Sequence, residues 1–550
     1  MVVRVGVGPQ RAELAVAGAV ERRQLRRLPH AHVVHGEQDG GQRHRQQISA
    51  DTGESMTCNQ ILQSSVNLAV ALQRLGLKKN DVVALSSENR FEFTVTALAI
   101  MYSGGVLSTL NVTYSPGEIS HVFNITKPKF IFTSPITAQN IHDCSKDLPY
   151  VQKIIVFGEF DIIPGLMYND LVKENVNVND FEVVDVNGMN DTVAIMCSSG
   201  TTGLPKGVEL THVNFLTLCA HMKYYLETSM AKRKHEVKTA MALIPWFHAY
   251  GFITSFALLS KPVKIVFLVR FEEQQFLETI QKYKVNMTTL VPPLAVFLAK
   301  HPLVTKYDLT SLNEVWCGAA PLSMEIQHAV AKRTGIQSIR QGYGLTEVTM
   351  ACCVDLTDKG KEGSCGTPAP GMQIKVIDIE SGKRLGPRKE GELWIKSPLR
   401  MKGYLGDKAS SDALIDAEGY VRTGDIGYYD EEGFFYIVDR LKELIKYKGF
   451  QVAPAELEAL LLQHKGVADC GVVGLPDETA GELPLAFVVP QPGHKPSEDE
   501  LVKYVASKVS PAKHLRGGVI FINEIPKNAS GKILRRELRA MLKQKQKSKL

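Results

Sequence analysis

Residues 198–207 combine three glycines, four hydroxyl side chains and one lysine directly after the apolar run 193–197. Glycine lets backbone amides approach an anion closely, and hydroxyl and ammonium groups add donors, so this composition predicts a cradle for a polyphosphate. The spacing is neither the common NTPase loop nor a Gly-x-Gly-x-x-Gly turn, which indicates another class of nucleotide enzyme. The alternative is a mobile surface loop. The predicted cradle residues are Ser198, Ser199, Gly200, Thr201, Thr202, Gly203 and Lys206.

Bulk properties exclude several other classes of protein. The net charge of +6 is small for 550 residues and gives no electrostatic argument for nucleic-acid binding. Apolar runs such as residues 252–259 are shorter than the roughly 20 residues of a membrane-spanning helix. The nine cysteines form no C-x-x-C pair, so neither a disulfide framework nor a thiolate zinc site is expected.

Further segments rich in Gly, Tyr, Asp and Lys follow at wide intervals, namely residues 245–248, 316–322, 341–347, 420–425, 438–450 and 526–532. Together with the first loop, and in this order, they resemble the adenylate-forming (ANL) superfamily of acyl-CoA synthetases, 4-coumarate:CoA ligases and beetle luciferases. The chain looks close to the insect luciferase-like fatty acyl-CoA synthetases. The resemblance implies ATP, Mg²⁺ and CoA as cofactors or co-substrates and a small carboxylic acid as the substrate.

The resemblance assigns a nucleotide site to several of these segments. Glu347 and Thr201 would hold Mg²⁺, and Thr346 would donate to the α-phosphate. Asp425 would accept hydrogen bonds from the ribose, with Arg440 as a fixed cation nearby. The adenine slot would comprise Gly318, Ala319, Ala320, Gln341, Gly342, Tyr343 and Gly344. The alternatives are an exposed turn for Glu347, an Asx turn for Asp425 and ordinary strand-to-loop packing for the slot.

The resemblance also assigns the chemical steps. Lys532 would be the catalytic cation between the carboxylate and the α-phosphate, although by position alone it reads as one more lysine of a Lys-rich tail. Lys442 aligns with a hinge about which the C-terminal domain turns between half-reactions. His248 stands at the family's aromatic gate, where a structural histidine is the alternative. The residues expected at the phosphate and the thioester-forming face are Lys446, Lys448, Gly449 and Gln451.

The order of apolar patterns predicts an α/β fold. Near-helical spacing of apolar residues from position 61 to 75 precedes a strand at 82–85, and the alternation recurs further along the chain. Short strands with Gly turns at about 370–440 indicate a small β-barrel-like subdomain. We therefore expect an AMP-binding N-terminal domain over residues 48–440, with two α/β subdomains and the barrel-like one, and a small mobile α+β lid over 441–550. Residues 1–47, rich in Arg, Gln, His and Gly, predict a disordered leader.

The resemblance implies an ATP-dependent acid:CoA ligase, and by analogy its substrates would be medium- or long-chain fatty acids. A 4-coumarate-type aromatic acid ligase, a luciferase-like monooxygenase and an inactive pseudo-ligase remain alternatives, although beetle luciferases carry two histidines where this chain has Phe247 and His248. The terminal tripeptide Ser548, Lys549 and Leu550 predicts recognition by the peroxisomal import receptor and a peroxisomal location. The sequence does not determine the chain length of the acid, the oligomeric state of the protein or whether it emits light.

Overall fold

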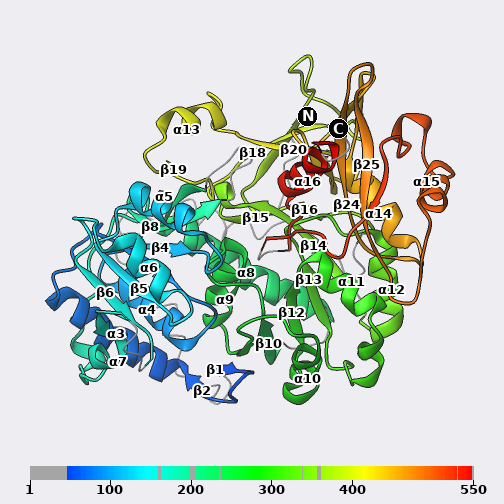
Figure 1. The fold of residues 1–550 in the computed structure, drawn as a ribbon. Coiled ribbons are helices and arrows are strands. Elements are labelled where there is room, and N and C mark those ends of the chain that lie inside the picture. Colours follow the sequence, from blue (N-terminus) through cyan, green and yellow to red (C-terminus); the bar gives the residue numbers. More distant parts are fainter. Residues whose placement is uncertain are drawn as a thin grey trace.

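The chain is a mixed α/β protein in which two large sheets carry most of the mass and two smaller sheets lie above them (Figure 1). The computed structural model describes residues 46–158, 163–198, 205–233, 237–336, 339–355, 361–528 and 531–547. Of the predicted leader, only Gln46 and Gln47 are among the described residues. Both lie in a strand of a large sheet, where they pair with Lys264 and Ile265. Gln46 and Gln47, which were assigned to the leader, therefore belong to the folded part: Gln47 is buried and donates to Thr94 at 3.0 Å.

The first large sheet holds the strands on either side of the Gly-rich loop. Its order is β19-β9-β8-β4-β3-β5-β6-β7, and β3, β4 and β5 are buried along almost their whole length, as expected for parallel strands covered on both faces. Its strands are β3 (Val82–Ser86), β4 (Val106–Leu110), β5 (Phe130–Thr133), β6 (Lys153–Val156), β7 (Leu166–Met167), β8 (Thr192–Ser198), β9 (Lys206–Thr211) and β19 (Gly403–Tyr404). Its helices are α3 (Cys58–Arg74), α4 (Phe91–Tyr102), α5 (Pro116–Thr126), α6 (Ala138–Ser145) and α7 (Tyr168–Leu171).

The second large sheet has the order β16-β15-β14-β13-β12-β10-β11-β1-β2. Its central strands β10, β12, β13 and β14 are parallel, so their carboxyl ends meet at one edge of the sheet, where ligands bind in folds of this kind. Its strands are β1 (Gln46–Ser49), β2 (Ser55–Thr57), β10 (Thr239–Ala242), β11 (Lys264–Phe267), β12 (Met287–Leu290), β13 (Glu314–Cys317), β14 (Ile339–Leu345), β15 (Met350–Val354) and β16 (Thr367–Pro368). The helices are α8 (His212–Arg233), α9 (Ala249–Leu259), α10 (Glu273–Tyr283), α11 (Pro292–Lys300) and α12 (Met324–Thr334).

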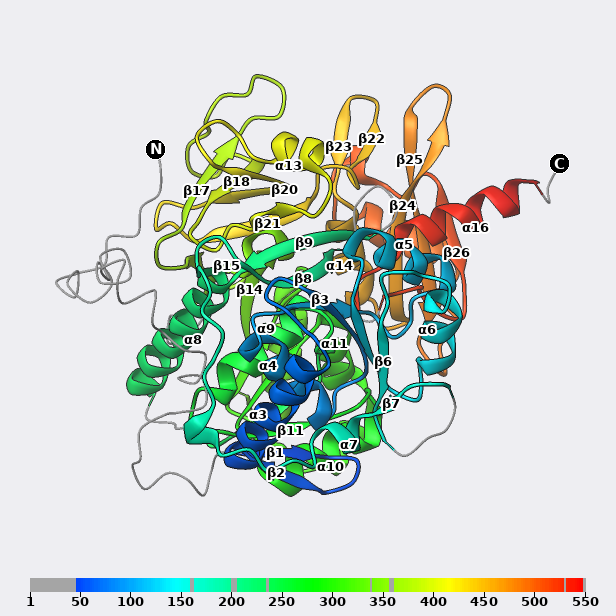
Figure 2. The same cartoon turned by 90° about the vertical axis from the view of Figure 1, so that its left-hand side faces the viewer.

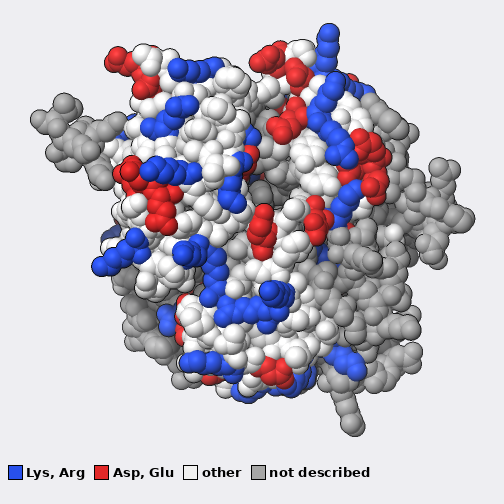
Figure 3. All heavy atoms as spheres, turned by 90° about the vertical axis from the view of Figure 1, so that its right-hand side faces the viewer, with Lys and Arg blue, Asp and Glu red and all other residues white. Residues whose placement is uncertain are grey.

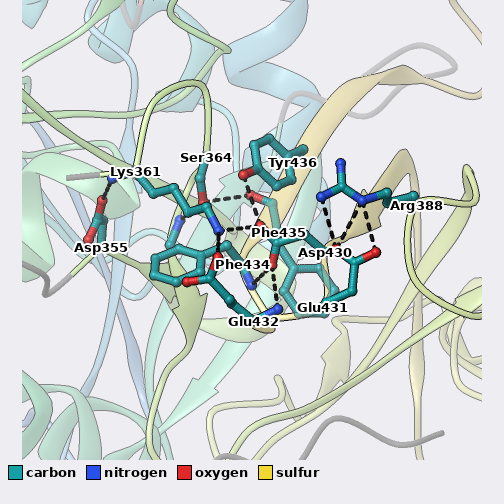
Figure 4. Close-up of polar contacts among 11 residues, drawn as sticks. Asp355, Lys361, Ser364, Arg388, Asp430, Glu431, Glu432, Phe434, Phe435 and Tyr436 are labelled. Carbon is teal, nitrogen blue, oxygen red and sulfur yellow. Dashed lines mark hydrogen bonds and ion pairs between the residues drawn. The ribbon is translucent and has the colours of Figure 1, made fainter.

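The small sheet predicted to be barrel-like is an open antiparallel sheet with the order β17-β18-β20-β21. Within the described residues its outer strands do not pair with each other, so the barrel is not closed. Ion pairs and hydrogen bonds tie the turn before β21 to the segment that leads into β16: Lys361 lies 2.7 Å from Asp430, and Ser364 donates to the carbonyl of Phe435 (Figure 4). The elements are β17 (Gln373–Ile377), β18 (Gly391–Lys396), α13 (Lys408–Leu414), β20 (Val421–Tyr429) and β21 (Phe435–Arg440).

The C-terminal unit follows β21 directly and lies beside the second large sheet, above α11 and α12 (Figure 1). Its strands pair in the order β23-β22-β25-β24, with β26 beside β25. It comprises β22 (Ile445–Tyr447), β23 (Phe450–Val452), α14 (Pro454–Gln463), β24 (Val467–Asp477), β25 (Gly481–Pro490), α15 (Glu498–Ala506), β26 (Gly518–Phe521) and α16 (Arg535–Lys547). Short 3-10 turns are η2 (Val178–Asp180), η3 (Pro302–Lys306), η4 (Thr346–Val348) and η5 (Pro511–Lys513). None of the helices in the described ranges is long and apolar enough to cross a bilayer.

Candidate active site

A cavity of about 1100 Å³ lies where the large sheets, the small sheet and the C-terminal unit meet. The carboxyl ends of β13 and β14 open into it through Gly318 and Thr346, and the segment after β10 contributes His248. The small sheet adds Arg440, and the C-terminal unit adds Lys532. Residues that lie far apart in the sequence therefore line one cavity, which is large enough for a nucleotide and an organic acid together.

Lys532 enters this cavity on a short turn that packs against the start of α11. The Asn528 side chain accepts a hydrogen bond from the Lys532 amide at 2.9 Å, and Gly531 adopts a φ of +75°. A Cβ atom on Gly531 would lie 3.0 Å from a methyl group of Val291, so glycine suits both the backbone and the space. Burial, and to a smaller extent the charge of Arg440, lowers the pKa of Lys532 to about 8. The Lys532 side chain is therefore mostly protonated, and positively charged, at neutral pH.

His248 lies on the same cavity at the N-terminal end of α9. Burial lowers the pKa of its imidazole to about 4, and the charge of Lys532 contributes in the same direction. The ring is therefore neutral at physiological pH. Its Nδ1 is buried and has no hydrogen-bond partner among the described residues.

Asp425 is fixed behind the cavity wall by two partners. The Tyr343 hydroxyl donates to one carboxylate oxygen at 2.7 Å, and the Arg440 guanidinium lies 3.0 Å from the other. Asp425 and Arg440 face each other on the paired strands β20 and β21. Asp425 is itself 4% exposed, whereas Tyr343 and Arg440 line the cavity. The carboxylate therefore orients two groups that a bound nucleotide would touch.

Tyr404 links the predicted phosphate lysine to the predicted metal ligand. Its hydroxyl donates to the Glu347 carboxylate at 2.9 Å, and the Lys206 ammonium group lies 4.8 Å from the centre of its ring. Lys206 also donates to Ser410 at 2.6 Å and lies 3.3 Å from Asp407. A carboxylate and an ammonium group thus line the same part of the cavity as Ser198, from which the Gly-rich loop departs.

The sequence model of the AMP-binding enzyme family matches residues 24–405, and that of the AMP-binding enzyme C-terminal domain matches residues 456–532. The chain belongs to the AMP-binding enzyme family. It is similar to luciferin 4-monooxygenase of Photuris pensylvanica, with 42% identity over 91% of this chain and 92% of that protein. It is also similar to the probable 4-coumarate–CoA ligase 3 of Dictyostelium discoideum, with 40% identity over 86% and 88% of the two chains.

Among solved structures, the fold matches the ATP-bound MatB of Rhodopseudomonas palustris with a TM-score of 0.82 and 25% identity, over 93% of this chain and 98% of that one. This agreement confirms the predicted superfamily and the predicted α/β fold with a large N-terminal and a small C-terminal domain. The predicted boundary at residue 440 is not tested and stays a prediction. The C-terminal family model ends at Lys532, so the residue in the cavity is part of the matched region.

Most of the residues that the sequence assigns to a site in this AMP-binding enzyme line the cavity, but not all. The predicted site residues on its wall are Ser198, Lys206, His248, Gly318, Ala319, Gln341, Gly342, Tyr343, Gly344, Thr346, Glu347, Arg440, Lys442, Lys446, Gln451 and Lys532. Ala320 is exposed and does not line it. Lys448 and Gly449 form the turn between β22 and β23, outside the cavity wall. Ser199, Gly200, Thr201, Thr202 and Gly203 lie outside the described residues.

Sequence reasoning missed the tyrosines that shape the cavity. Tyr404 precedes α13 in a segment with no recognisable motif, and Tyr225 and Tyr250 lie on the helices α8 and α9. The hydroxyl of Tyr250 donates to the Trp316 carbonyl at 3.1 Å. Apolar spacing on α8 was the only available signal for Tyr225, and such spacing is typical of any core-facing helix.

Proposed function

We propose that this AMP-binding enzyme is an ATP-dependent acid:CoA ligase that acts on medium- or long-chain fatty acids. The observation that carries the proposal is the convergence of Lys532, Arg440 and Glu347 on one cavity beside the start of the Gly-rich loop. A cation between the two reactants favours the step in which charge moves from the carboxylate to the phosphate.

In the first half-reaction a carboxylate oxygen of the acid attacks the α-phosphorus of ATP. A new P–O bond forms, the bond to the β-phosphate oxygen breaks, and pyrophosphate leaves. Lys532 neutralises charge on both reactants, and Arg440, held by Asp425, adds a second fixed cation. In the second half-reaction the sulfur of CoA attacks the acyl carbon of the mixed anhydride, the thiol proton is released, and AMP leaves. Lys446 and Gln451 line the cavity, and in this proposal they contact the adenylate phosphate.

Glu347 fits a role in holding Mg²⁺. Its carboxylate is a hard oxygen ligand on the cavity wall, and Mg²⁺ in such enzymes is typically held by one or two carboxylates together with substrate phosphates. The described residues contain no cluster of three or more metal-ligating side chains, so substrate phosphates would complete the set of ligands. The metal would supply charge neutralisation for the departing pyrophosphate.

The direct test is incubation of the purified chain with ATP, Mg²⁺, CoA and a panel of fatty and hydroxycinnamic acids, with products identified by mass spectrometry. We expect an acyl-CoA, AMP and pyrophosphate in equal amounts. Formation of an aromatic thioester alone would replace the fatty-acid proposal by the 4-coumarate-type alternative. Absence of both adenylate and thioester from folded protein would contradict the ligase proposal and favour a pseudo-ligase.

A luciferase-like oxidation is a second candidate, favoured by the 42% identity to luciferin 4-monooxygenase. Phe247 precedes His248 here, and Phe247 is buried at 7% exposure, so a second histidine is missing beside the first. The same reaction mixture with firefly luciferin and O₂ tests this candidate. Light emission above that of a Lys532→Ala control would support this candidate. Absence of light would leave the ligase proposal as the better supported function.

A peroxisomal location is proposed from Ser548, Lys549 and Leu550 alone, which lie outside the described residues. Acidic and basic side chains are intermixed on the described part of the face shown in Figure 3. Imaging of the fluorescently tagged chain beside a peroxisomal marker, with and without residues 548–550, tests the location. Retention of the marker overlap after the deletion would contradict it.

A further inference from the structure

Tyr404 lies on β19, at the edge of the first large sheet, and its backbone is fixed to the neighbouring strand β9. It pairs with Val208, and the amide of Leu405 donates to the carbonyl of Gly207 at 2.8 Å. β9 lies on the side of this sheet that is nearer the small sheet (Figure 2). Because β9 begins at Lys206, the lysine of the Gly-rich segment, the position of Tyr404 is tied to that of the predicted phosphate loop.

The same segment also holds the turn that carries Glu347. The amide of Met401 donates to the backbone carbonyl of Glu347 at 2.8 Å, and the hydroxyl of Thr349 donates to the carbonyl of Leu399 at 2.6 Å. Thr349 has a φ of +54°, in the left-handed region that β-branched residues rarely adopt. Such a conformation persists where the surrounding structure enforces it. Residues 399–405 therefore fix both the strand after the phosphate loop and the turn with the predicted metal ligand.

The side chain of Tyr404 joins these two parts of the cavity. Its hydroxyl donates to Oε1 of Glu347 at 2.9 Å, and a carboxylate can only accept, so the direction of this bond is fixed. In the part of the chain that the structure describes, no other side chain bonds to this carboxylate. The ammonium group of Lys206 lies 4.8 Å from the centre of the tyrosine ring, a distance typical of a cation–π contact. One side chain thus orients a carboxylate with its hydroxyl and an ammonium group with its ring.

We propose that Tyr404 is a positioning residue of the metal site: its hydroxyl holds one oxygen of Glu347 and leaves the other to bind the Mg²⁺ that accompanies ATP. This inference rests on the proposed function and extends it to a residue outside the sequence motifs. Carboxylates that bind metal ions are typically fixed by hydrogen bonds of this kind. Tyr404 would act through Glu347, without contact to the metal or to the reacting atoms.

The contribution of Mg²⁺ to ATP binding tests the proposal. Dissociation constants of ATP are measured by calorimetry in Mg²⁺ and in EDTA, and their ratio gives the gain in affinity that the metal provides. In Tyr404→Phe we expect this gain to shrink by about 10-fold, as is typical when a metal ligand loses its hydrogen-bond partner. ATP binding in EDTA should be retained, because phenylalanine keeps the ring beside Lys206. Tyr404 is half-buried and loses only one oxygen, so the fold should be kept.

A spectroscopic measurement gives a second readout that needs no turnover. Mn²⁺ also prefers carboxylate and water oxygen ligands, so it can replace Mg²⁺ as a paramagnetic probe. The relaxation of water protons then reports the complex of enzyme, Mn²⁺ and ATP. We expect the dissociation constant of Mn²⁺ from this complex to rise by about 10-fold in Tyr404→Phe.

Two further variants serve as controls. Tyr436→Phe removes a comparable bond, of 3.1 Å from a tyrosine hydroxyl to the carboxylate of Asp430, and neither residue lines the cavity. It should retain the wild-type gain from Mg²⁺. Glu347→Gln should lose most of the gain. Addition of Tyr404→Phe to Glu347→Gln should then lower the gain no further, because residues that act through one contact are not additive.

A wild-type gain from Mg²⁺ in Tyr404→Phe would overturn the inference. A further loss in the double variant would also overturn it, since Tyr404 would then act by a route other than Glu347. An undiminished gain in Glu347→Gln would remove Glu347 from the metal site and the inference with it. Neither measurement requires an acid or CoA. Loss of the gain in Tyr404→Phe, from an enzyme that forms no acyl-CoA, would therefore support the role of Tyr404 and contradict the ligase function alone.

Discussion

The ammonium group of Lys300, at the end of α11, donates a hydrogen bond of 2.7 Å to the backbone carbonyl of Leu462 in α14. It donates a second bond, of 2.9 Å, to the carbonyl of Val467 at the start of β24. Burial lowers the pKa of Lys300. These contacts join the second large sheet to the C-terminal unit in the arrangement that brings Lys532 into the cavity.

Replacement of Lys300 should therefore act on one half-reaction more than on the other. In Lys300→Met we expect pyrophosphate release to slow by about 10-fold, because charge-assisted hydrogen bonds contribute roughly 1.5–3 kcal/mol. Conversion of a supplied acyl-adenylate and CoA to the thioester should slow much less. Lys284→Met is the matched control, since Lys284 is 63% exposed and pairs with Asp308 on the surface. Equal losses in both half-reactions would show that Lys300 has no orienting role.

Asp425→Asn should weaken ATP binding. The substitution removes the charge that holds Arg440 at 3.0 Å and changes the acceptor of the Tyr343 hydroxyl. We expect the dissociation constant of ATP, measured by calorimetry, to rise about 10- to 100-fold, the equivalent of 1.4–3 kcal/mol. Asp430→Asn is the control: it removes the charge that pairs with Lys361 beside the small sheet (Figure 4), and neither residue lines the cavity. An unchanged ATP affinity in Asp425→Asn would remove Asp425 from the nucleotide site.

Gly344→Ala should destabilise the fold beside the adenine slot. The β14–β15 ladder is irregular between Tyr343 and Gly344, and a Cβ on Gly344 would lie 1.3 Å from the Met350 carbonyl oxygen. Because the obstacle is backbone, we expect the free energy of unfolding to fall by about 3 kcal/mol or more in chemical denaturation. In Gly342→Ala the new Cβ meets only an oxygen at 3.7 Å, so stability should be retained. Equal stability of the two variants would contradict this local geometry.

The pH dependence of acid activation should follow Lys532. Its pKa is lowered to about 8, so the ammonium group is charged below that pH and loses its proton above it. We expect kcat/KM for pyrophosphate release to fall as the pH rises through about 8, since this parameter reports the free enzyme. In Lys532→Arg the alkaline limb should move beyond pH 10, because guanidinium stays protonated. A wild-type limb that starts only near pH 10 would show that Lys532 is not the titrating group.

Short motifs were enough to predict the family, the α/β fold and most of the cavity wall, because several of them, at residues 198–207, 316–322 and 341–347, lie where β8, β13 and β14 end at the cavity. The strand expected at residues 82–85 is β3, and the near-helical spacing at residues 61–75 falls in α3. The contact between Lys300 and Leu462 spans 162 positions and involves a backbone carbonyl, for which no residue pattern exists. The hydrogen bond from Tyr404 to Glu347 likewise joins residues that are 57 positions apart.

The most direct test of the central claim compares the two half-reactions in Lys532→Ala. If Lys532 drives adenylation, the variant should lose pyrophosphate release from ATP and acid by at least about 100-fold, as expected for loss of a group that stabilises transition-state charge. It should still convert a supplied acyl-adenylate and CoA to the thioester. Lys527→Ala, which removes a lysine paired with Asp469 at 2.5 Å, is the control and should retain both activities. Pyrophosphate release by Lys532→Ala at the wild-type rate would contradict the account.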